Sequence, residues 1–248
     1  MAATSTYYSP ELYAKQRAGS HRSAAITVPY VMELLRPRSV VDIGCGVGTW
    51  LAEFIAAGVE ECRGIDGASA RDAELKIPVA CFAVGDMTAP LALPHRYDLA
   101  VSLEVAEHLP ADAAEIYIDS VTAAAPVILF SAAIPQQGGP GHINEQWQDF
   151  WREKFSARGF EAVDAIRPLI WGNAEVAWWY QQNTIIYASS EALAAHPHLS
   201  PVPKERSLNL VHPSLYERQL NMGLRRTLET LPRLVAHAVK SQMRRRAT

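Results

Sequence analysis

Residues 40–50 read Val40-Val41-Asp42-Ile43-Gly44-Cys45-Gly46-Val47-Gly48-Thr49-Trp50. The β-branched run from Ser39 to Ile43 is typical of a buried strand. Three glycines at alternate positions follow it, and a helix with apolar residues on one face begins directly after them. Glycines at a turn between a strand and a helix let backbone N–H groups approach a ligand without an intervening Cβ atom. The stretch therefore predicts a turn that binds a nucleotide-like ligand.

The spacing of these glycines differs from that of a dinucleotide-binding turn. The dinucleotide fingerprint is G-x-G-x-x-G, whereas this chain has Asp-x-Gly-x-Gly-x-Gly. That pattern resembles motif I of the class I S-adenosylmethionine-dependent methyltransferases. The resemblance implies that Gly44, Gly46 and Gly48 lie beside the methionine part of S-adenosyl-L-methionine. It also implies that Asp42 bonds the amino group of this cofactor, directly or through water. A tight turn in another α/β protein is the alternative.

Acidic residues also follow the next predicted strands. Asp66 ends a strand predicted at 61–66 and can accept hydrogen bonds from a ribose diol, although an Asp before Gly also forms turns. The resemblance implies that Asp86 bonds the adenine amino group and that Met87 packs on the adenine ring. Ligands of α/β folds bind at the carboxyl ends of the strands. The acidic residues predicted at that edge are Asp42, Asp66, Asp86 and Glu104.

Strand and helix patterns alternate through most of the chain. Strands are predicted at 39–43, 61–66, 79–84, 97–103, 125–131, 160–167 and 183–188. Helices are predicted at 23–35, after the glycine turn, at 112–124, and from residue 142 to residue 155. This alternation predicts an α/β fold, namely a Rossmann-like seven-stranded methyltransferase sandwich with a C-terminal helical extension. We place the cofactor-binding domain at 1–190, and a linker with a basic amphipathic helical tail at 191–248.

The residues after the fourth predicted strand read Glu104-Val105-Ala106-Glu107-His108-Leu109. They resemble the EVxEHL signature of a methyltransferase subgroup that acts on small molecules. An oxygen acceptor can need a base, and His108 and His142 are the candidates, because histidine titrates near neutral pH. The structural alternative for His142 is a residue that starts a helix. For His108 it is a packed side chain bonded to Glu104 one helical turn earlier.

A metal site is a second interpretation of the same residues. Glu104, Glu107, His108 and His142 resemble the metal-binding pattern of small-RNA 2′-O-methyltransferases. Such oxygen and nitrogen ligands suit magnesium or manganese. The signature, however, is widespread in metal-free relatives. We therefore expect no bound metal and an activity that survives treatment with a chelator.

The composition is that of a globular protein. The chain has 248 residues, of which 49% are hydrophobic and 20% are charged, so it can form a large buried core. It contains no apolar run of the length that a transmembrane helix needs, and its first residues lack the pattern of a secretory signal. Its three cysteines form no Cys-x-x-Cys pair, which indicates a reducing compartment. We therefore expect a cytoplasmic protein.

Charge is distributed unevenly along the chain. Residues 201–248 hold ten Lys or Arg and three Asp or Glu, a net charge of +7, whereas the first 200 residues have a net charge of −10. The acidic body argues against a nucleic-acid partner, because RNA-binding grooves are usually basic. Leucines recur at helical spacing in the tail, so its apolar face must be buried. We expect it to pack on its own chain or in a homodimer rather than on a membrane.

These patterns together predict an S-adenosylmethionine-dependent methyltransferase. The expected reaction is O-methylation of a small-molecule hydroxyl, on a sugar, a glycan or a secondary-metabolite intermediate. A metal-dependent RNA terminal 2′-O-methyltransferase is the second interpretation, and a non-catalytic cofactor-binding subunit is the third. Oxygen, nitrogen and carbon remain alternatives for the acceptor atom.

Overall fold

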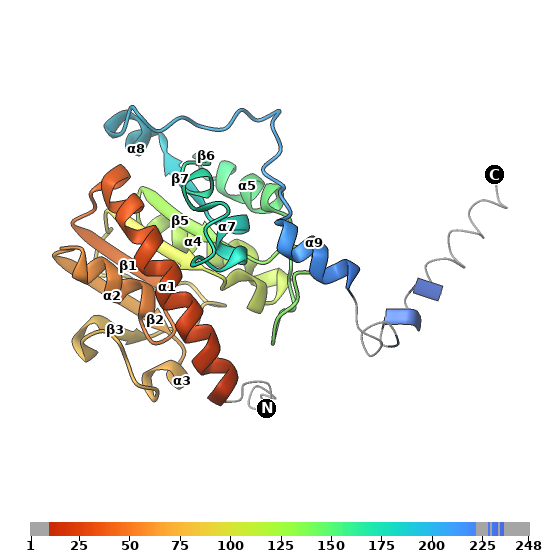
Figure 1. Ribbon diagram of the computed structural model, residues 1–248. Coiled ribbons are helices and arrows are strands. Elements are labelled where there is room, and N and C mark those ends of the chain that lie inside the picture. The colour runs from red at the N-terminus through yellow and green to blue at the C-terminus, as the bar shows by residue number, and fades with distance from the viewer. Residues whose placement is uncertain (1–9, 222–227, 229, 233, 236–248) are drawn as a thin grey trace. The chain divides into compact units, whose positions relative to one another are not determined.

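The computed structural model describes residues 10–221, 228, 230–232 and 234–235, with side chains from residue 19 onward (Figure 1). The chain divides into two units, Met1–Leu210 and Val211–Thr248. The first unit therefore continues beyond residue 190, where the predicted linker begins. Much of the predicted basic tail, including residues 244–246, lies outside the described residues.

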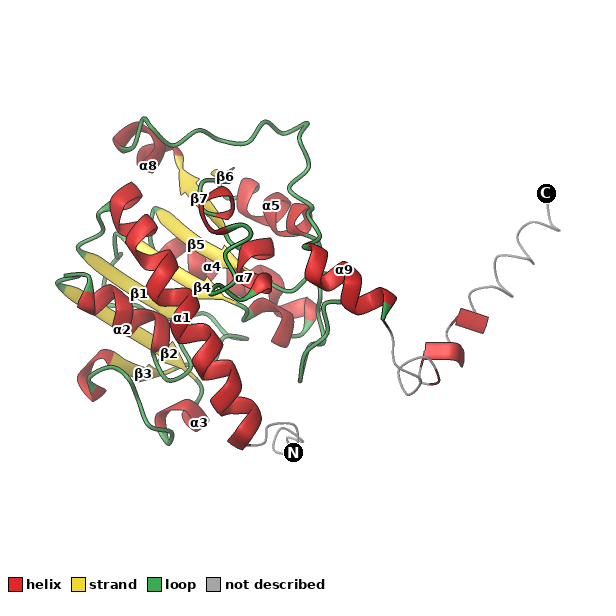
Figure 2. Cartoon of the chain, viewed as in Figure 1, coloured by secondary structure: helices red, strands yellow, loops and turns green. Residues whose placement is uncertain are grey.

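A seven-stranded mixed sheet forms the centre of the first unit (Figure 2). Its strands are β1 Ser39–Ile43, β2 Glu61–Asp66, β3 Phe82–Val84, β4 Leu99–Leu103, β5 Val127–Ser131, β6 Phe160–Val163 and β7 Ile185–Ser189. The strand order is β3-β2-β1-β4-β5-β7-β6. Strand β7 runs antiparallel to β5 and β6, and the other pairs are parallel. This arrangement confirms the predicted Rossmann-like sandwich and brings the carboxyl ends of β1 to β5 to one edge.

Helices connect the strands in the expected alternation. The first unit contains α1 Pro10–Leu35, α2 Thr49–Ala56, α3 Ala68–Arg71, α4 Ala114–Ala124, α5 Gln148–Ser156, α6 Arg167–Ile170, α7 Trp178–Asn183 and α8 Ser190–Ala195. Short 3-10 helices are η1 Val79–Cys81, η2 Ala106–His108 and η3 Ala111–Ala113, and the second unit contains α9 Pro213–Leu220. None of the helices in the described part of the chain combines the length and apolar character that a membrane crossing requires.

Apolar cores lie on both faces of the sheet. Val40 of β1 packs with α1 and α2 on one face, and Val41 packs with α4 and α5 on the other. This alternation is the two-residue period of a strand. Because both faces of β1 and β4 are buried, these strands read as nearly continuous apolar runs. Polar side chains that can contact a ligand therefore lie mainly at the carboxyl ends of these strands.

Strands β4, β5 and β7 each begin two residues later than predicted. Strands β3 and β6 differ most from their predicted bounds, and a proline lies beside each of these two changes. Val79–Cys81 forms η1 directly after a proline, so β3 begins only at Phe82. Strand β6 ends at Val163 instead of residue 167, because Pro168 lies in the first turn of α6, where its fixed φ favours a helix. The helix predicted from residue 23 begins earlier, at Pro10.

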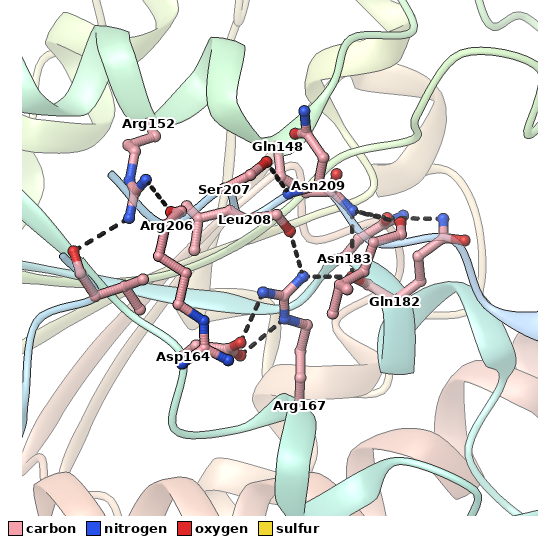
Figure 3. Close-up of polar contacts among 12 residues, drawn as sticks. Gln148, Arg152, Asp164, Arg167, Gln182, Asn183, Arg206, Ser207, Leu208 and Asn209 are labelled. Atoms are coloured by element: carbon pink, nitrogen blue, oxygen red, sulfur yellow. Dashed lines mark hydrogen bonds and ion pairs between the residues drawn. The ribbon is translucent and has the colours of Figure 1, made fainter. Parts of the chain in front are cut away.

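Residues 199–210, which we call the strap, were predicted as part of a linker but are bonded to the domain (Figure 3). The guanidinium group of Arg152 donates hydrogen bonds to four carbonyl oxygens of the strap at 2.7 to 3.5 Å. Arg167 donates to the carbonyl oxygen of Leu208 at 2.9 Å, and the Leu208 side chain is buried in the core. These contacts correct the linker prediction, since a proline-rich composition does not reveal distant arginines that bond the segment.

Candidate active site

The glycine turn joins β1 to α2, as predicted. The N–H groups of Gly44 and Cys45 donate to the carbonyl oxygen of Ile65 at 2.8 and 3.1 Å, which holds the turn against the end of β2. Gly44, Gly46 and Gly48 have φ angles of +84°, +55° and +84°. Glycine adopts this left-handed conformation without steric strain, so the sequence pattern and the backbone geometry agree.

The three glycines differ in their surroundings. A Cβ atom on Gly44 would lie 2.4 Å from Val105 Cγ2, and one on Gly48 would lie 2.8 Å from Ile77 Cγ1. A Cβ atom on Gly46 would meet no atom within 4 Å. Gly44 and Gly48 therefore allow close packing, whereas Gly46 borders open space. That space beside a partly buried stretch of backbone fits the cofactor that the glycine pattern implies.

Asp42 lies in β1 with only 4% of its surface exposed. Burial, followed by the charge of Asp66, raises the pKa of its carboxyl to about 8. A cationic group placed beside this carboxyl would stabilise its ionised form and lower that pKa. The chemistry of Asp42 therefore fits a ligand that carries an ammonium group, as the methionine part of S-adenosylmethionine does.

Asp66 holds the glycine turn through its side chain. Its Oδ2 atom accepts a hydrogen bond from the N–H of Gly46 at 2.6 Å, and its Oδ1 atom accepts one from the N–H of Gly67 at 2.6 Å. Both the turn-forming and the ligand-binding interpretations remain compatible with this geometry, because each carboxylate oxygen has a further lone pair. The bond to Gly46 across 20 residues brings Asp66 and Asp42 to the same part of the edge.

Asp86 lies further along the same edge, after β3. Its Oδ1 atom accepts hydrogen bonds from the N–H and the hydroxyl of Thr88 at 2.8 and 2.6 Å, and these bonds lower the pKa of this exposed carboxyl. A cavity of about 310 Å³ borders Asp86, with Arg63 and Leu91 in its wall. Met87 is half-buried against the core beside α4. The cavity does not include the glycine turn, so Asp86 borders a recess of its own.

Glu104 follows β4 and adopts a strained backbone conformation. Its φ angle is +56°, which is uncommon for a residue with a Cβ atom. Its Oε2 atom accepts a hydrogen bond from Gln137 Nε2 at 2.8 Å, and its Oε1 atom accepts one from Asn183 Nδ2 at 3.1 Å. Burial raises the pKa of this carboxyl, and the two amide donors act in the opposite direction. The side chain is therefore held in one orientation.

His108 and His142 lie in contact, with ring centroids 4.9 Å apart and planes nearly perpendicular. His108 Nδ1 lies 3.3 Å from the carbonyl oxygen of Gly141, and His142 Nδ1 lies 3.0 Å from Glu145 Oε1. Burial, followed by the charge of His142, lowers the pKa of His108 to about 4. The structural alternative, in which His108 bonds Glu104 one helical turn earlier, does not occur, because the helix η2 begins only at Ala106.

Glu107 lies beside this histidine pair and is fully buried. Neither of its carboxylate oxygens has a hydrogen-bond partner among the described residues. Burial, followed by the charge of Glu104, raises the pKa of Glu107 well above its ordinary value. One carboxylate oxygen of Glu107 and one ring nitrogen each from His108 and His142 lie within 4.8 Å of one another. The structure thus brings together three of the four residues that resemble a metal-binding pattern, and Glu104 is a neighbour of Glu107.

Three polar residues of the site were not predicted from the sequence. Glu145 accepts hydrogen bonds from the N–H groups of Gln136 and Gly138 at 2.7 and 2.6 Å in addition to its contact with His142. It therefore fixes the glycine-rich loop and the histidine together. The other two, Gln137 and Asn183, hold Glu104. The spacing of Glu145 three residues after His142 was a local signal, but nothing local connects Glu104 with Asn183, 79 residues away.

Comparison with known proteins identifies the relatives of this fold. Residues 13–130 match the family described as "Methyltransferase domain", and no curated protein matches the chain. The Streptomyces venezuelae protein DesVI matches with a TM-score of 0.56 and 14% identity, over 73% of this chain and 98% of that chain. CalS10, an amino pentose methyltransferase from Micromonospora echinaspora solved with S-adenosylmethionine bound, matches with a TM-score of 0.54 and 14% identity, over 76% and 100%. A Nostoc punctiforme PCC 73102 protein matches with a TM-score of 0.53 and 15% identity, over 75% of this chain and 64% of that chain.

The sheet order, the glycine turn and the family match define the class of this protein. Its fold is that of the class I S-adenosylmethionine-dependent methyltransferases, and residues 13–130 match the family described as "Methyltransferase domain". These matched residues include the glycine turn and the acidic residues Asp42, Asp66, Asp86 and Glu104. The solved structures share the fold at low identity, so the acceptor must be argued from the site of this chain.

Proposed function

We propose that this enzyme transfers a methyl group to a hydroxyl oxygen of a small molecule such as a sugar. The observation that carries the proposal is the contact between His108 and His142. This pair lies just beyond Val105, which packs against Gly44 of the cofactor turn. A hydroxyl must lose its proton on methylation, and a neutral imidazole can accept it. The amino pentose substrate of CalS10 supports an acceptor of sugar-like size.

We assign one role at the cofactor to each part of the edge. Asp42 bonds the amino group of the methionine part, and Glu104 lies beside the same methionine part. Asp66 accepts hydrogen bonds from the ribose hydroxyls. It uses the carboxylate lone pairs that the N–H groups of Gly46 and Gly67 leave free. Asp86 and Met87 hold the adenine. Gly44 and Gly48 let the turn pack closely against Val105 and Ile77, and Gly46 leaves the space for the methionine part beside it.

The bound cofactor supplies an activated methyl group, and the protein supplies position and proton handling. The acceptor oxygen forms a bond to the methyl carbon as the carbon–sulfur bond breaks, and the electron pair of that bond stays on sulfur. When the Nδ1–H of neutral His142 donates a hydrogen bond to Glu145 Oε1, its Nε2 atom is free to accept a proton. The contact between Glu145 and His142 thus orients the candidate base. A carboxylate orients the catalytic histidine in the same way in Ser-His-Asp hydrolases.

The test combines product identification with a histidine variant. The purified chain is supplied with ¹³C-methyl S-adenosylmethionine and a panel of sugars that carry hydroxyl or amino groups. We expect a new O–CH₃ resonance, and we expect His142→Ala to lower kcat by roughly 10²- to 10⁴-fold, the usual contribution of a general base. The affinity for S-adenosylmethionine, measured by calorimetry, should not change.

The matched control is His95→Ala, because His95 is an exposed histidine beside an acidic residue, 3.1 Å from Glu61. This variant should keep the wild-type kcat. An N–CH₃ product from an amino sugar, with no O–CH₃ product, would overturn the hydroxyl assignment. A kcat that is equally unaffected by both substitutions would remove His142 from the mechanism.

Methylation of an RNA terminal 2′-hydroxyl is the second candidate. It is favoured by the proximity of Glu107, His108 and His142, and the acidic body of the chain opposes it, since the first 200 residues have a net charge of −10. Short RNA with a free terminal 2′-hydroxyl, compared with the same RNA already methylated there, separates this candidate from a small-molecule acceptor. The family match favours an enzyme over a non-catalytic subunit.

A further inference from the structure

The connection between β3 and β4 contains no helix. Residues 85–98 form only turns and irregular backbone, whereas the crossover between two parallel strands is usually helical. Leu91 and Leu93 of this connection are only partly buried against the core around α4. The cavity of about 310 Å³ beside Asp86 is lined by this connection together with β2 and β3. The irregular crossover therefore leaves a space on the sheet that a regular helix would cover.

Apolar side chains form most of the wall of this cavity. Ile65 and Ala83 are paired neighbours in β2 and β3, and Leu91 adds to the wall from the connection. The volume is at the lower limit of the range for small-molecule sites. Of the described residues that we assign to the cofactor, Asp86 alone contributes to the wall. The cavity is thus a place for a small second ligand.

Arg63 brings a cationic side chain to this apolar wall. It lies in β2 two residues before Ile65, so both side chains share one face of the sheet. Arg63 is half-buried, and it takes part in none of the ion pairs between described residues. Glu61, two residues earlier on the same face, lies 3.1 Å from His95 instead. Because a buried arginine is rarely left without a partner, Arg63 is available to an anion from outside the chain.

The charges in the wall favour a ligand with one negative charge. Arg63 presents parallel N–H donors that match the geometry of a carboxylate. Asp86 is the acidic residue of the wall, and its two hydrogen bonds from Thr88 lower the pKa of its carboxyl. Asp86 is therefore ionised at neutral pH and opposes a second negative charge on the ligand.

We propose that this cavity binds a small monocarboxylate with an apolar body, such as an aromatic acid. Its carboxylate forms an ion pair with Arg63, and its apolar body contacts Ile65 and Ala83. Neither His108 nor His142 belongs to the wall, so this ligand is an effector rather than the methyl acceptor. The site therefore does not depend on which acceptor the enzyme uses.

Binding is tested on the full chain with sodium benzoate as the probe. Saturation-transfer difference NMR detects the contact, and calorimetry gives the Kd. We expect one benzoate per chain, and we expect Arg63→Met to weaken its binding by at least about tenfold, the loss of a charged hydrogen bond. Arg96→Met is the matched control, because Arg96 is exposed and does not line the cavity. A wild type that binds no benzoate, or equal effects of the two substitutions, would overturn the proposal.

Two further probes separate the contributions of the ring and the charge. Benzamide keeps the ring without the charge, and inorganic phosphate keeps the charge without the ring. Each should bind at least about tenfold more weakly than benzoate, because each lacks one of the two contacts. Phosphate that binds as tightly as benzoate would show general attraction of anions and would contradict the apolar part of the site.

A cavity-filling variant locates the ligand without changing any charge. Ala83→Leu places three more carbon atoms in the cavity and should abolish benzoate binding while Arg63 is still present. This variant keeps the test valid if Arg63→Met does not fold. Benzoate binding that Ala83→Leu leaves unchanged would place the ligand elsewhere.

Competition separates the cavity from the cofactor edge. Benzoate is titrated into the chain in the presence of saturating S-adenosylhomocysteine. We expect both molecules to bind together, because the cavity shares only Asp86 with the residues that we assign to the cofactor. Displacement of benzoate by S-adenosylhomocysteine would show that the two share one site, and it would overturn the proposal of a second ligand.

Discussion

Residues of the same type at the sheet edge have different properties because their surroundings differ. Asp42 is buried, and its pKa is raised to about 8. Asp86 is exposed and bonded to Thr88, and its pKa is lowered. Desolvation penalises the charged form of a carboxyl, whereas hydrogen-bond donors favour it. The sequence shows four acidic residues at strand ends, and only the structure shows how deeply each of them is buried.

Asp42 should make the stability of the ligand-free protein depend on pH. Its folded-state pKa is higher than that of an ordinary Asp, so its contribution to stability is complete at acidic pH and is lost as the pH rises from about 4 to about 8. Asp42→Asn cannot ionise and should avoid this loss. Urea unfolding between pH 5 and pH 9 should show the variant gaining stability relative to the wild type up to about pH 8.

The exposed Asp112→Asn is the control and should follow the wild type at every pH. S-adenosylmethionine should bind Asp42→Asn more weakly, because the proposed partner of its ammonium group has lost its charge. A wild type and an Asp42→Asn variant with parallel pH profiles would show that Asp42 is ionised without cost in the ligand-free protein.

Alanine substitutions at Gly44 and Gly46 separate the effect of an added methyl group on packing from its effect on ligand binding. Gly44→Ala places its Cβ 2.4 Å from Val105, so we expect a loss of about 1–3 kcal/mol in the free energy of unfolding from overpacking, in addition to backbone strain. Gly46→Ala meets no atom and should cost only the strain of a positive φ, about 1–2 kcal/mol. Calorimetry should nevertheless show weaker S-adenosylmethionine binding for Gly46→Ala, and unchanged binding would place the cofactor elsewhere.

At the scale of elements, the strap is held by buried arginine side chains rather than by secondary structure of its own. Figure 3 shows Arg152 and Arg167 directed at strap residues. Arg167 also forms an ion pair with Asp164 at 2.7 Å and donates to the carbonyl of Gln182 at 3.2 Å, next to Asn183, which bonds Glu104. Contacts thus run from the strap to the active site through α7.

Arg152→Met should release the strap. The substitution keeps much of the apolar stem and removes the donors to four carbonyl oxygens, so we expect the free energy of unfolding to fall by roughly 2–4 kcal/mol. Hydrogen exchange should become faster at residues 202–208. Arg22→Met is the control, because Arg22 forms only an exposed ion pair with Glu175 at 3.7 Å, worth under about 1 kcal/mol. Equal effects of the two substitutions would contradict this account.

At the scale of the whole molecule, an acidic catalytic unit is followed by a separate basic unit. The first ends at Leu210 and the second begins at Val211. Within the second unit, the described side chains of Leu228, Leu231 and Leu234 are exposed. Apolar side chains at helical spacing favour burial against another surface. We propose that a second copy of this chain provides it, since the tail lacks the Trp and Phe of membrane-surface helices.

Truncation after Leu210 tests this assignment without removing the strap. We expect the full chain to sediment as a dimer and the truncated chain as a monomer with unchanged S-adenosylmethionine affinity. Neither should float with anionic liposomes at physiological salt. Flotation of the full chain that the truncation abolishes would identify a membrane surface as the partner, and identical sedimentation would exclude the tail from any dimer.

Local patterns were sufficient to predict the seven strands and the glycine turn. Val40 and Val41 face opposite cores, so β1 is mostly apolar apart from Asp42, and the positive φ angles at Gly44, Gly46 and Gly48 favour glycine. Both signals lie within a few residues of one another. The start of β3 and the end of β6 were predicted less well, because a proline beside each of them outweighed the apolar pattern.

The state of the candidate active site depended on contacts between distant residues. Gln137 and Asn183 hold Glu104, and the approach of His142 to His108 leaves Glu107 buried beside two imidazoles. The strap likewise depends on Arg152, about 50 residues before it in the chain. The amino-acid sequence therefore specified which chemical groups are present and which local backbone forms they favour. Burial and partner choice arise only when the folded chain removes water and brings separate segments together.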